Sequence, residues 1–173
     1  AALEEFAIEA SLLKVASSEM VDFVVDENVQ IQGGNGFVAD YPAERRYRDA
    51  RVNRIFEGTN EINRLILPGT LIKRGMKGAL GLVPAAKAVR DELMTVAPPE
   101  ATPAATDAVA GGRRAAAGPP KAVLVAVGLA LETYGESLTN EQEVLMALAD
   151  LMIEAFAADS AALRVAIQGI VNG

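Results

Sequence analysis

The sequence predicts an all-α protein, a helical bundle that ends in a small additional helical region. Apolar residues recur at spacings of three, four and seven over several long stretches, which is the period of an amphipathic helix. Alanine is abundant and aromatic residues make up only 5% of the 173 residues, a composition that favours helix over sheet. Sustained alternation of polar and apolar residues, the mark of a half-buried strand, is absent from the sequence.

The first predicted element is one long amphipathic helix over residues 1–30. Its apolar stripe consists of Leu3, Phe6, Leu13, Met20, Val24 and Val25. Glycine adopts the left-handed conformations that close helices, so Gly33, Gly34 and Gly36 are expected to end it.

A short charged helix is expected next over residues 44–54, followed by a break. A second strong helix is predicted over residues 60–78, with Asn60 as its N-cap because asparagine is a favoured residue type there. Pro68 and Gly69 should kink or interrupt this helix, since proline removes a backbone donor and clashes with the preceding turn.

The rest of the chain is expected to be a helix, a linker and a helical pair. Residues 84–96 predict a helix, whereas residues 97–120 are rich in proline and alanine and predict a mobile linker. Helices are then predicted over 121–138 and 140–168. The expected organisation is therefore a helical domain, a linker and a C-terminal helical region, over 1–96, 97–120 and 121–173.

Composition excludes several classes of site. The net charge is −7 and the pI about 4.7, which disfavours binding to nucleic acid. Cysteine and histidine are both absent, so a disulfide, a Cys-His pair, a Ser-His-Asp triad and a histidine metal site are excluded, and we expect no metal. Acid–base chemistry must come from Asp, Glu, Lys or Tyr.

The start of the chain and its apolar segments suggest expectations for the cellular compartment and for membrane contact. The sequence begins with Ala1 inside a helical pattern, so we expect a piece of a longer protein, cytoplasmic in a bacterium or mitochondrial in a eukaryote. The longest strongly apolar run, residues 122–131, is shorter than the roughly 20 residues that span a bilayer. The polar face of the last helix is acidic, so membrane contact is not expected.

Two clusters are candidate ligand sites, each with a simpler alternative. The glycine-rich segment after the first helix could bring backbone N–H groups to a phosphate, or could be a plain helix C-cap and turn. Five arginines could bind an anion, or could form ion pairs with Glu44, Asp49 and nearby helices, or a subunit contact. The two clusters are Gln30, Ile31, Gln32, Gly33, Gly34, Asn35 and Gly36, and Arg45, Arg46, Arg48, Arg51 and Arg54.

Glu57 is the candidate general base. It stands between two helical segments, beside Ile55 and Phe56 on one side and Gly58 on the other. Apolar neighbours would strip water from the carboxylate and raise its pKa, which would make it a useful base. The alternative is an exposed loop glutamate.

Together these segments resemble the C-terminal signature of the acyl-CoA dehydrogenase family. The order and spacing of four pieces match, and the likeness covers residues 1 to about 80. The region from Asn140 to Asp150 is similar to the extra C-terminal helical region of the very-long-chain branch. The four pieces are Val29-Gln30-Ile31-Gln32-Gly33-Gly34-Asn35-Gly36-Phe37, Pro42-Ala43-Glu44-Arg45, Tyr47-Arg48-Asp49-Ala50-Arg51 and Ile55-Phe56-Glu57-Gly58-Thr59-Asn60-Glu61-Ile62.

The resemblance implies an FAD-dependent enzyme that oxidises acyl-CoA to trans-2-enoyl-CoA in fatty-acid β-oxidation, with electron-transferring flavoprotein reoxidising the flavin and a homo-oligomer, dimer or tetramer. By the motif, Glu57 is the base and Gly58 contacts the substrate. Positions matching the family's FAD contacts are Thr59, Asn60 and Glu61, and those facing FAD of a neighbouring subunit are Gln30, Ile31, Gln32, Gly33 and Gly34.

The sequence also departs from the family pattern. Phe37 replaces a frequent tyrosine, and Pro68-Gly69 stands where some members carry an arginine. The family's N-terminal helical and central β-domains are not part of this sequence, so we expect the chain alone to be inactive. A helical interaction module that keeps the signature without turnover is the alternative.

Overall fold

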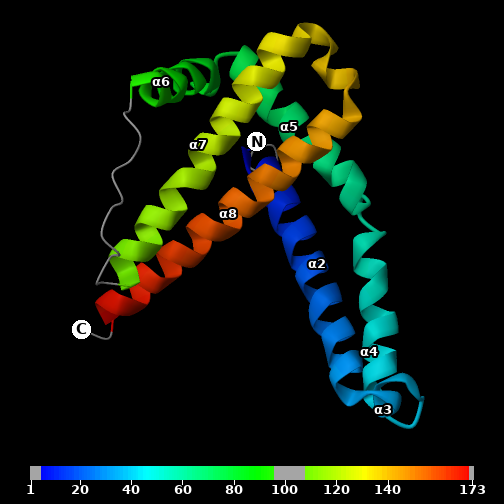
Figure 1. Ribbon diagram of the computed structural model, residues 1–173. Helices are drawn as coiled ribbons and strands as arrows, with labels where there is room; N and C mark the ends of the chain where they lie inside the picture. Colours follow the sequence, from blue (N-terminus) through cyan, green and yellow to red (C-terminus); the bar gives the residue numbers. More distant parts are fainter. Residues whose placement is uncertain (1–4, 96–107, 172–173) are drawn as a thin grey trace. The chain divides into compact units, whose positions relative to one another are not determined.

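The computed structural model describes residues 5–95 and 108–171, and these form helices connected by short loops (Figure 1). No strand occurs within these ranges, so the predicted all-α class is confirmed. In chain order the elements are α2 (Ala7–Gln32), α3 (Gly34–Phe37), α4 (Pro42–Arg51), the 3₁₀ helix η1 (Val52–Arg54), α5 (Asn60–Met76), α6 (Leu82–Thr95), α7 (Ala108–Tyr134), the 3₁₀ helix η2 (Gly135–Asn140) and α8 (Gln142–Val171).

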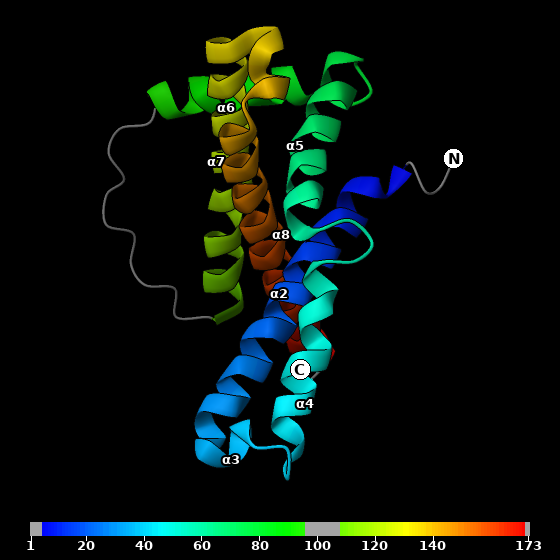
Figure 2. The same cartoon turned by 90° about the vertical axis from the view of Figure 1, so that its right-hand side faces the viewer.

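The chain divides into two compact units, Ala1–Leu67 and Pro68–Gly173. In the first unit α2 and α4 lie side by side as a helical hairpin, joined at one end by α3 (Figure 2). Ala43 and Ala50 are buried, and they lie seven residues apart on one face of α4. Their small side chains let the backbone of α2 come close.

The second unit is built on the antiparallel pair α7 and α8, which η2 connects, with α6 packed on α7 (Figures 1 and 2). Val127 of α7 and Leu138 of η2 are almost fully buried. Gly128 allows close packing of α6, because a Cβ added at this glycine would stand 3.3 Å from the Cβ of Ala86.

The buried face of α2 differs from the predicted one. The residues that are buried are Leu12, Val15 and Ser18, whereas most of the predicted stripe is exposed. Met20 and Phe23, for example, each have 65% of their surface exposed. Helical periodicity shows that a helix has an apolar face but not which face is buried. Because α2 is apolar on more than one side, the sequence pattern did not identify the buried one. The exposed side chains form a face that nothing in the described part of the first unit covers.

Pro68 and Gly69 are expected from the sequence to kink or interrupt the second strong helix; an interruption does not occur, because α5 runs without a break from Asn60 to Met76. An interior proline costs a helix about 3 kcal/mol, mostly through a lost hydrogen bond and a backbone clash. Leu67 and Pro68 are both almost fully buried, and full burial of a large apolar side chain contributes about 1.5–3 kcal/mol. Burial therefore compensates for most of the local defect.

The expected linker over 97–120 is helical in its second part. Residues 97–107 lie outside the described residues, and residues 108–120 form the beginning of α7. The helix expected to start at residue 121 thus starts at Ala108, with Pro119 and Pro120 inside it. Alanine has the lowest cost in a helix, but this stretch also contains three glycines and two prolines, so local propensity alone does not explain why the helix forms there.

One described stretch, Ala117–Asn140, meets the length and apolarity of a membrane-crossing helix, which the shorter run at residues 122–131 did not suggest. Its buried positions Val123, Val127 and Ala130 recur at helical spacing and form the side of α7 that packs in the second unit. A helix in the core of a water-surrounded bundle has the same composition, so length and apolarity do not by themselves assign a membrane role.

The almost complete burial of Leu138 makes it a test of the second unit. Leu138→Ala should lower the free energy of unfolding by about 2–5 kcal/mol, because the lost methyl groups leave a cavity. Leu163→Ala on α8 removes the same atoms from an exposed position and should change it by less than about 0.5 kcal/mol. Urea unfolding followed by circular dichroism measures both, and equal effects would contradict the described core.

The exposed apolar face of α2 generates a second prediction. The chain on its own should self-associate, because exposed apolar patches of this kind drive contact between molecules. Light scattering at increasing protein concentration should show growing mass, and Phe23→Lys should reduce it. A strictly monomeric profile at every concentration would argue against this role for the face.

Candidate active site

Glu57 lies in the loop between η1 and α5, in a backbone conformation that glutamate rarely adopts. Its φ is 53°, and that of Gly58 is 81°, so two successive residues are left-handed. Among the described residues, Glu57 is the single non-glycine residue with positive φ. A left-handed conformation costs a residue with a side chain roughly 1–2 kcal/mol. Such strain tends to occur at functional sites, where surrounding contacts maintain it.

Gly58 has little room for a side chain. A Cβ there would stand 3.0 Å from Nδ2 of Asn63, in addition to the positive φ. Asn63 Nδ2 donates hydrogen bonds to the carbonyl oxygens of Gly58 at 2.9 Å and Thr59 at 3.1 Å. The first turn of α5 therefore folds back onto the loop that precedes it and fixes the loop's end.

The N-cap of α5 is Thr59, so the prediction that Asn60 caps this helix is wrong. The Thr59 hydroxyl accepts a hydrogen bond from the backbone N–H of Ile62 at 3.2 Å. Glu61 follows in the first turn and is exposed. A hydrogen bond from its own backbone N–H lowers the pKa of the Glu61 carboxyl, against an opposing effect of desolvation. Glu61 is consequently a weaker base than an ordinary glutamate.

Asn60 is fully buried, and its amide connects α5 to α2. Its Nδ2 donates to Ser18 Oγ at 2.9 Å and to Glu19 Oε1 at 3.1 Å, and its Oδ1 accepts from Lys14 Nζ at 2.6 Å. Every polar atom of the side chain thus has a partner inside the chain. The predicted role of Asn60 toward FAD stays a prediction, and its side-chain amide is already occupied.

The face of α2 toward this loop is polar. Lys14, Ser18 and Asp22 are spaced by four residues and therefore lie along one side of the helix. Asp22 Oδ2 pairs with Arg54 Nη1 at 2.7 Å, while its Oδ1 is buried without a hydrogen-bond partner.

Glu19, next to this face, binds Arg64 through two hydrogen bonds of 2.7 and 2.9 Å. The Arg64 hydrogen bond lowers the pKa of the Glu19 carboxyl, although partial burial opposes the shift. Sequence reasoning missed Lys14, Ser18, Glu19 and Arg64. The four-residue spacing of polar side chains within an apolar helix was the signal that could have found Lys14 and Ser18, whereas no such signal marks Glu19 or Arg64.

The surroundings of Glu57 differ from the expected apolar environment. Glu57 is exposed, and so are its neighbours Ile55 and Phe56, at 55% and 47% of their surface. A loop between two helices supplies only one layer of side chains, so these residues do not strip water from the carboxylate. Desolvation of Glu57 requires a ligand or further polypeptide on this side.

The predicted glycine-rich cluster lies elsewhere in the first unit. Residues 30–34 are exposed, and Figure 1 places them beside α3, at the end of the α2–α4 hairpin away from the start of α5. Gly33 closes α2 with a φ of 58°. Gly36 is buried, and a Cβ there would come within 2.5 Å of the Val29 carbonyl oxygen. The expected C-cap and turn is therefore present, and the structure does not bring this cluster to Glu57.

The arginine cluster is divided between two roles. Arg54 forms the ion pair with Asp22, and Arg45 lies 3.8 Å from Asp49 in an exposed pair. Exposed pairs of this kind contribute little to stability. Arg46, Arg48 and Arg51 are exposed on α4. The simpler reading, with ion pairs rather than an anion site, is supported for Arg45 and Arg54.

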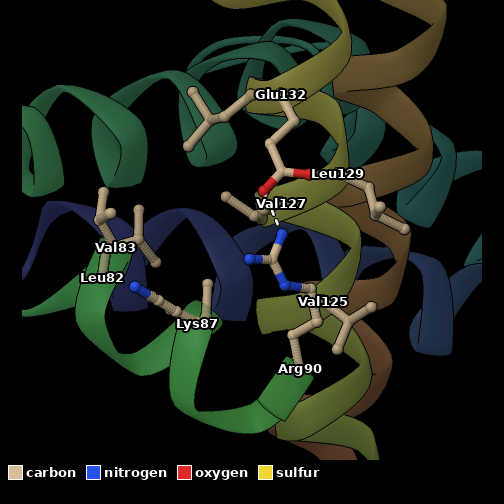
Figure 3. A pocket seen from close by; sticks show the side chains of 11 residues that line it. Leu82, Val83, Lys87, Arg90, Val125, Val127, Leu129 and Glu132 are labelled. Atoms are coloured by element: carbon tan, nitrogen blue, oxygen red, sulfur yellow. Dashed lines mark hydrogen bonds and ion pairs between the residues drawn. The ribbon is translucent and has the colours of Figure 1, made fainter. Parts of the chain in front are cut away.

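A pocket of about 260 Å³ lies between α6 and α7 in the second unit (Figure 3). Leu82 and Val83 of α6 and Val127 of α7 give it an apolar lining, and an ion pair between Arg90 and Glu132 closes one side. None of the predicted site residues lines it. The pocket is thus a separate feature from the loop that carries Glu57.

Two family descriptions match this chain, both for the C-terminal domain of acyl-CoA dehydrogenases, over residues 2–71 and 120–171. A probable acyl-CoA dehydrogenase of Bacillus subtilis is 46% identical over 162 residues, which are 94% of this chain and 27% of that protein. The mitochondrial short-chain specific acyl-CoA dehydrogenase of Bos taurus is 48% identical over 68 residues, 39% of this chain and 16% of that protein.

A solved structure is also similar, that of an acyl-CoA dehydrogenase complexed with FAD from Bacillus anthracis. Its TM-score is 0.84 and its sequence identity 47%, over 94% of this chain and 26% of that one. The chain thus spans about a quarter of the length of these two bacterial relatives. The order of helices, the sequence signature around Glu57 and these similarities agree. The chain therefore belongs to the acyl-CoA dehydrogenase family and corresponds to its all-helical C-terminal part.

Proposed function

We propose that this chain supplies the catalytic base, Glu57, to an FAD-dependent enzyme that oxidises acyl-CoA thioesters to trans-2-enoyl-CoA in fatty-acid β-oxidation. The observation that carries the proposal is the strained, left-handed backbone of Glu57, followed by a glycine and exposed at the start of a helix. A carboxylate on such a backbone is accessible to a substrate, and the restrained backbone fixes the direction in which the side chain leaves it.

The step assigned to Glu57 is the removal of a proton from the carbon next to the thioester carbonyl. The carboxylate accepts this proton, and bound FAD supplies the acceptor for the hydride that leaves the neighbouring carbon. Gly58 leaves space for close approach of the thioester, because it has no side chain. A bound substrate would cover the carboxylate and remove water from it, which would strengthen it as a base.

The described residues around the Glu57 loop form a surface that suits contact with FAD. Ile55, Phe56 and Ile62 expose apolar surface around the loop, and such surface suits a flat aromatic ring system. We assign Thr59 and Glu61 at the start of α5 to hold the cofactor there. The Asn60 side chain would instead support the start of α5 through its hydrogen bonds to Ser18 and Glu19 of α2.

Residues 30–34 suit a contact with FAD of a neighbouring subunit. They are exposed, and Ile31 shows 82% of its surface. Their place at the far end of the hairpin means that they and Glu57 serve different flavins if both are used. The proposal therefore includes a homo-oligomer, and it includes electron-transferring flavoprotein as the partner that reoxidises the flavin.

Glu57→Gln in the full-length enzyme tests the proposal. The amide keeps the size of the side chain but cannot accept the proton, so the rate of flavin reduction should fall by at least about 10²–10⁴-fold. Flavin content and acyl-CoA binding should remain. Anaerobic mixing with acyl-CoA, followed at the flavin absorbance near 450 nm, measures this rate.

Glu61→Gln provides the comparison for this experiment, because Glu61 is another exposed carboxylate near Glu57 on α5. It should retain rapid flavin bleaching, whatever its effect on flavin affinity. Rapid bleaching in the Glu57→Gln enzyme would mean that the base lies elsewhere. A full-length parent protein that neither binds FAD nor reacts with acyl-CoA would favour the helical interaction module instead.

The chain by itself should bind FAD weakly or not at all and should not turn over acyl-CoA. It spans about a quarter of its bacterial relatives, and the apolar surface around Glu57 is uncovered. Absorbance of the purified chain after addition of FAD and gel filtration measures retention. Dehydrogenase activity of these residues alone with an artificial electron acceptor would contradict the prediction.

A further inference from the structure

The loop that carries Glu57 needs contacts that hold it in place. Two successive left-handed residues, one of them a glutamate, are unfavourable on their own. The exposed side chains of this loop supply no burial that would fix it. The hydrogen bonds to its backbone and to its two ends must therefore maintain the conformation.

Lys14 reaches the loop from α2, 44 residues earlier in the sequence than Gly58. Its Nζ donates to the Gly58 carbonyl oxygen at 2.8 Å and to Asn60 Oδ1 at 2.6 Å. Hydrogen bonds from a charged donor are about twice as strong as those between neutral groups. Lys14 thus restrains the carbonyl of the residue that directly follows Glu57.

The buried amide of Asn60 fixes the direction of this contact. Its Nδ2 donates to Ser18 Oγ and Glu19 Oε1, and its Oδ1 accepts from the Lys14 ammonium and, at 3.2 Å, from Ser18 Oγ. The opposite orientation of the amide would bring its NH₂ group against the cation. Lys14 is consequently held between two acceptors of defined position, and its long side chain loses the freedom to move off the loop.

The other end of the loop is attached to the same face of α2. Arg54, the last residue of η1, pairs with Asp22, which lies two helical turns after Lys14. The segment from Ile55 to Thr59 is thus tied at both ends to one rigid helix. The Gly58 carbonyl also accepts a hydrogen bond from Asn63 Nδ2 of α5 at 2.9 Å, so α2 and α5 together hold the Gly58 end of the loop.

We infer that Lys14 is a positioning residue for Glu57: by holding the Gly58 carbonyl, it keeps the Glu57 backbone left-handed and its carboxylate in reach of the substrate. The inference rests on the proposed function of Glu57 as the base. No described contact joins Lys14 to the Glu57 carboxylate itself, so its effect passes through the backbone.

The test compares three variants of the full-length holoenzyme. Lys14→Met removes the donors but keeps a long unbranched side chain, Lys14→Arg keeps a cation with donors, and Lys77→Met removes an exposed lysine near the end of α5 as a matched control. The measurements are flavin content, KM, the rate of anaerobic flavin reduction per bound flavin, and the isotope effect with acyl-CoA deuterated at the α-carbon.

Lys14→Met should lower the reduction rate per bound flavin by about 10–100-fold, because a shift of the order of 1 Å in a reacting group has a cost of this size. KM and flavin content should stay close to those of the parent, and the isotope effect should rise because proton removal becomes more rate-limiting. Lys14→Arg should recover much of the rate, and Lys77→Met should match the parent.

A purely structural role for Lys14 predicts a different pattern, in which flavin content falls while the rate per bound flavin and the isotope effect are unchanged. That pattern would overturn the inference. If Lys14→Met retains no flavin, the rate of amide hydrogen exchange in residues 55–63 of the flavin-free full-length protein distinguishes the positioning role from a purely structural one. Faster exchange confined to these residues supports the inference, whereas unchanged exchange, or exchange that is faster throughout the first unit, overturns it.

Glu57→Gln, measured in parallel, separates this inference from the proposed function. Parent-like bleaching in Glu57→Gln would remove the proposed function, and the inference with it. An inactive Glu57→Gln together with a fully active Lys14→Met would remove the inference alone.

Discussion

The buried amide of Asn60 is the contact on which the candidate site depends. It joins the first residue of α5 to the polar face of α2 through Ser18, Glu19 and Lys14. A buried amide is stable only when its hydrogen bonds are made, and an unsatisfied one costs about 1–3 kcal/mol. The network is therefore specific: moving α5 along α2 by one residue would leave Asn60 or its partners without hydrogen bonds. This fixes the point at which the loop of Glu57 enters the helix.

Two further ion pairs restrict the same junction. Arg64 holds Glu19 from the second turn of α5, and Arg54 holds Asp22 from the end of η1. Because these residues are only partly buried, the gain from each pair is moderated by solvent. Their main effect is to fix positions, because one pair restrains the chain just before the loop and the other restrains it just after. The left-handed backbone of Glu57 is then supported by contacts outside the loop, as strained conformations at functional sites generally require.

The exposed surfaces of the first unit have a common explanation. The apolar face of α2, the surroundings of Glu57 and the glycine-rich turn are all uncovered in this chain. Their apolar and strained character is costly in water and suits surfaces that meet a substrate, a cofactor or further polypeptide. The chain spans about a quarter of the length of its two bacterial relatives, which is consistent with that character.

The sequence by itself determined the helical class, the order of the helices and most of their ends, because helical periodicity, glycine stops and caps act over a few residues. It also identified the signature with Glu57, Gly58 and Thr59. Only the tertiary structure decided which face of α2 is buried, that α5 continues through Pro68, and that Asn60 is a buried connector rather than a cap. It also decided that Glu57 is exposed and left-handed and that Lys14 holds its loop. The contacts of Asn60 and Lys14 join residues more than 40 positions apart in the chain, which no local pattern can pair.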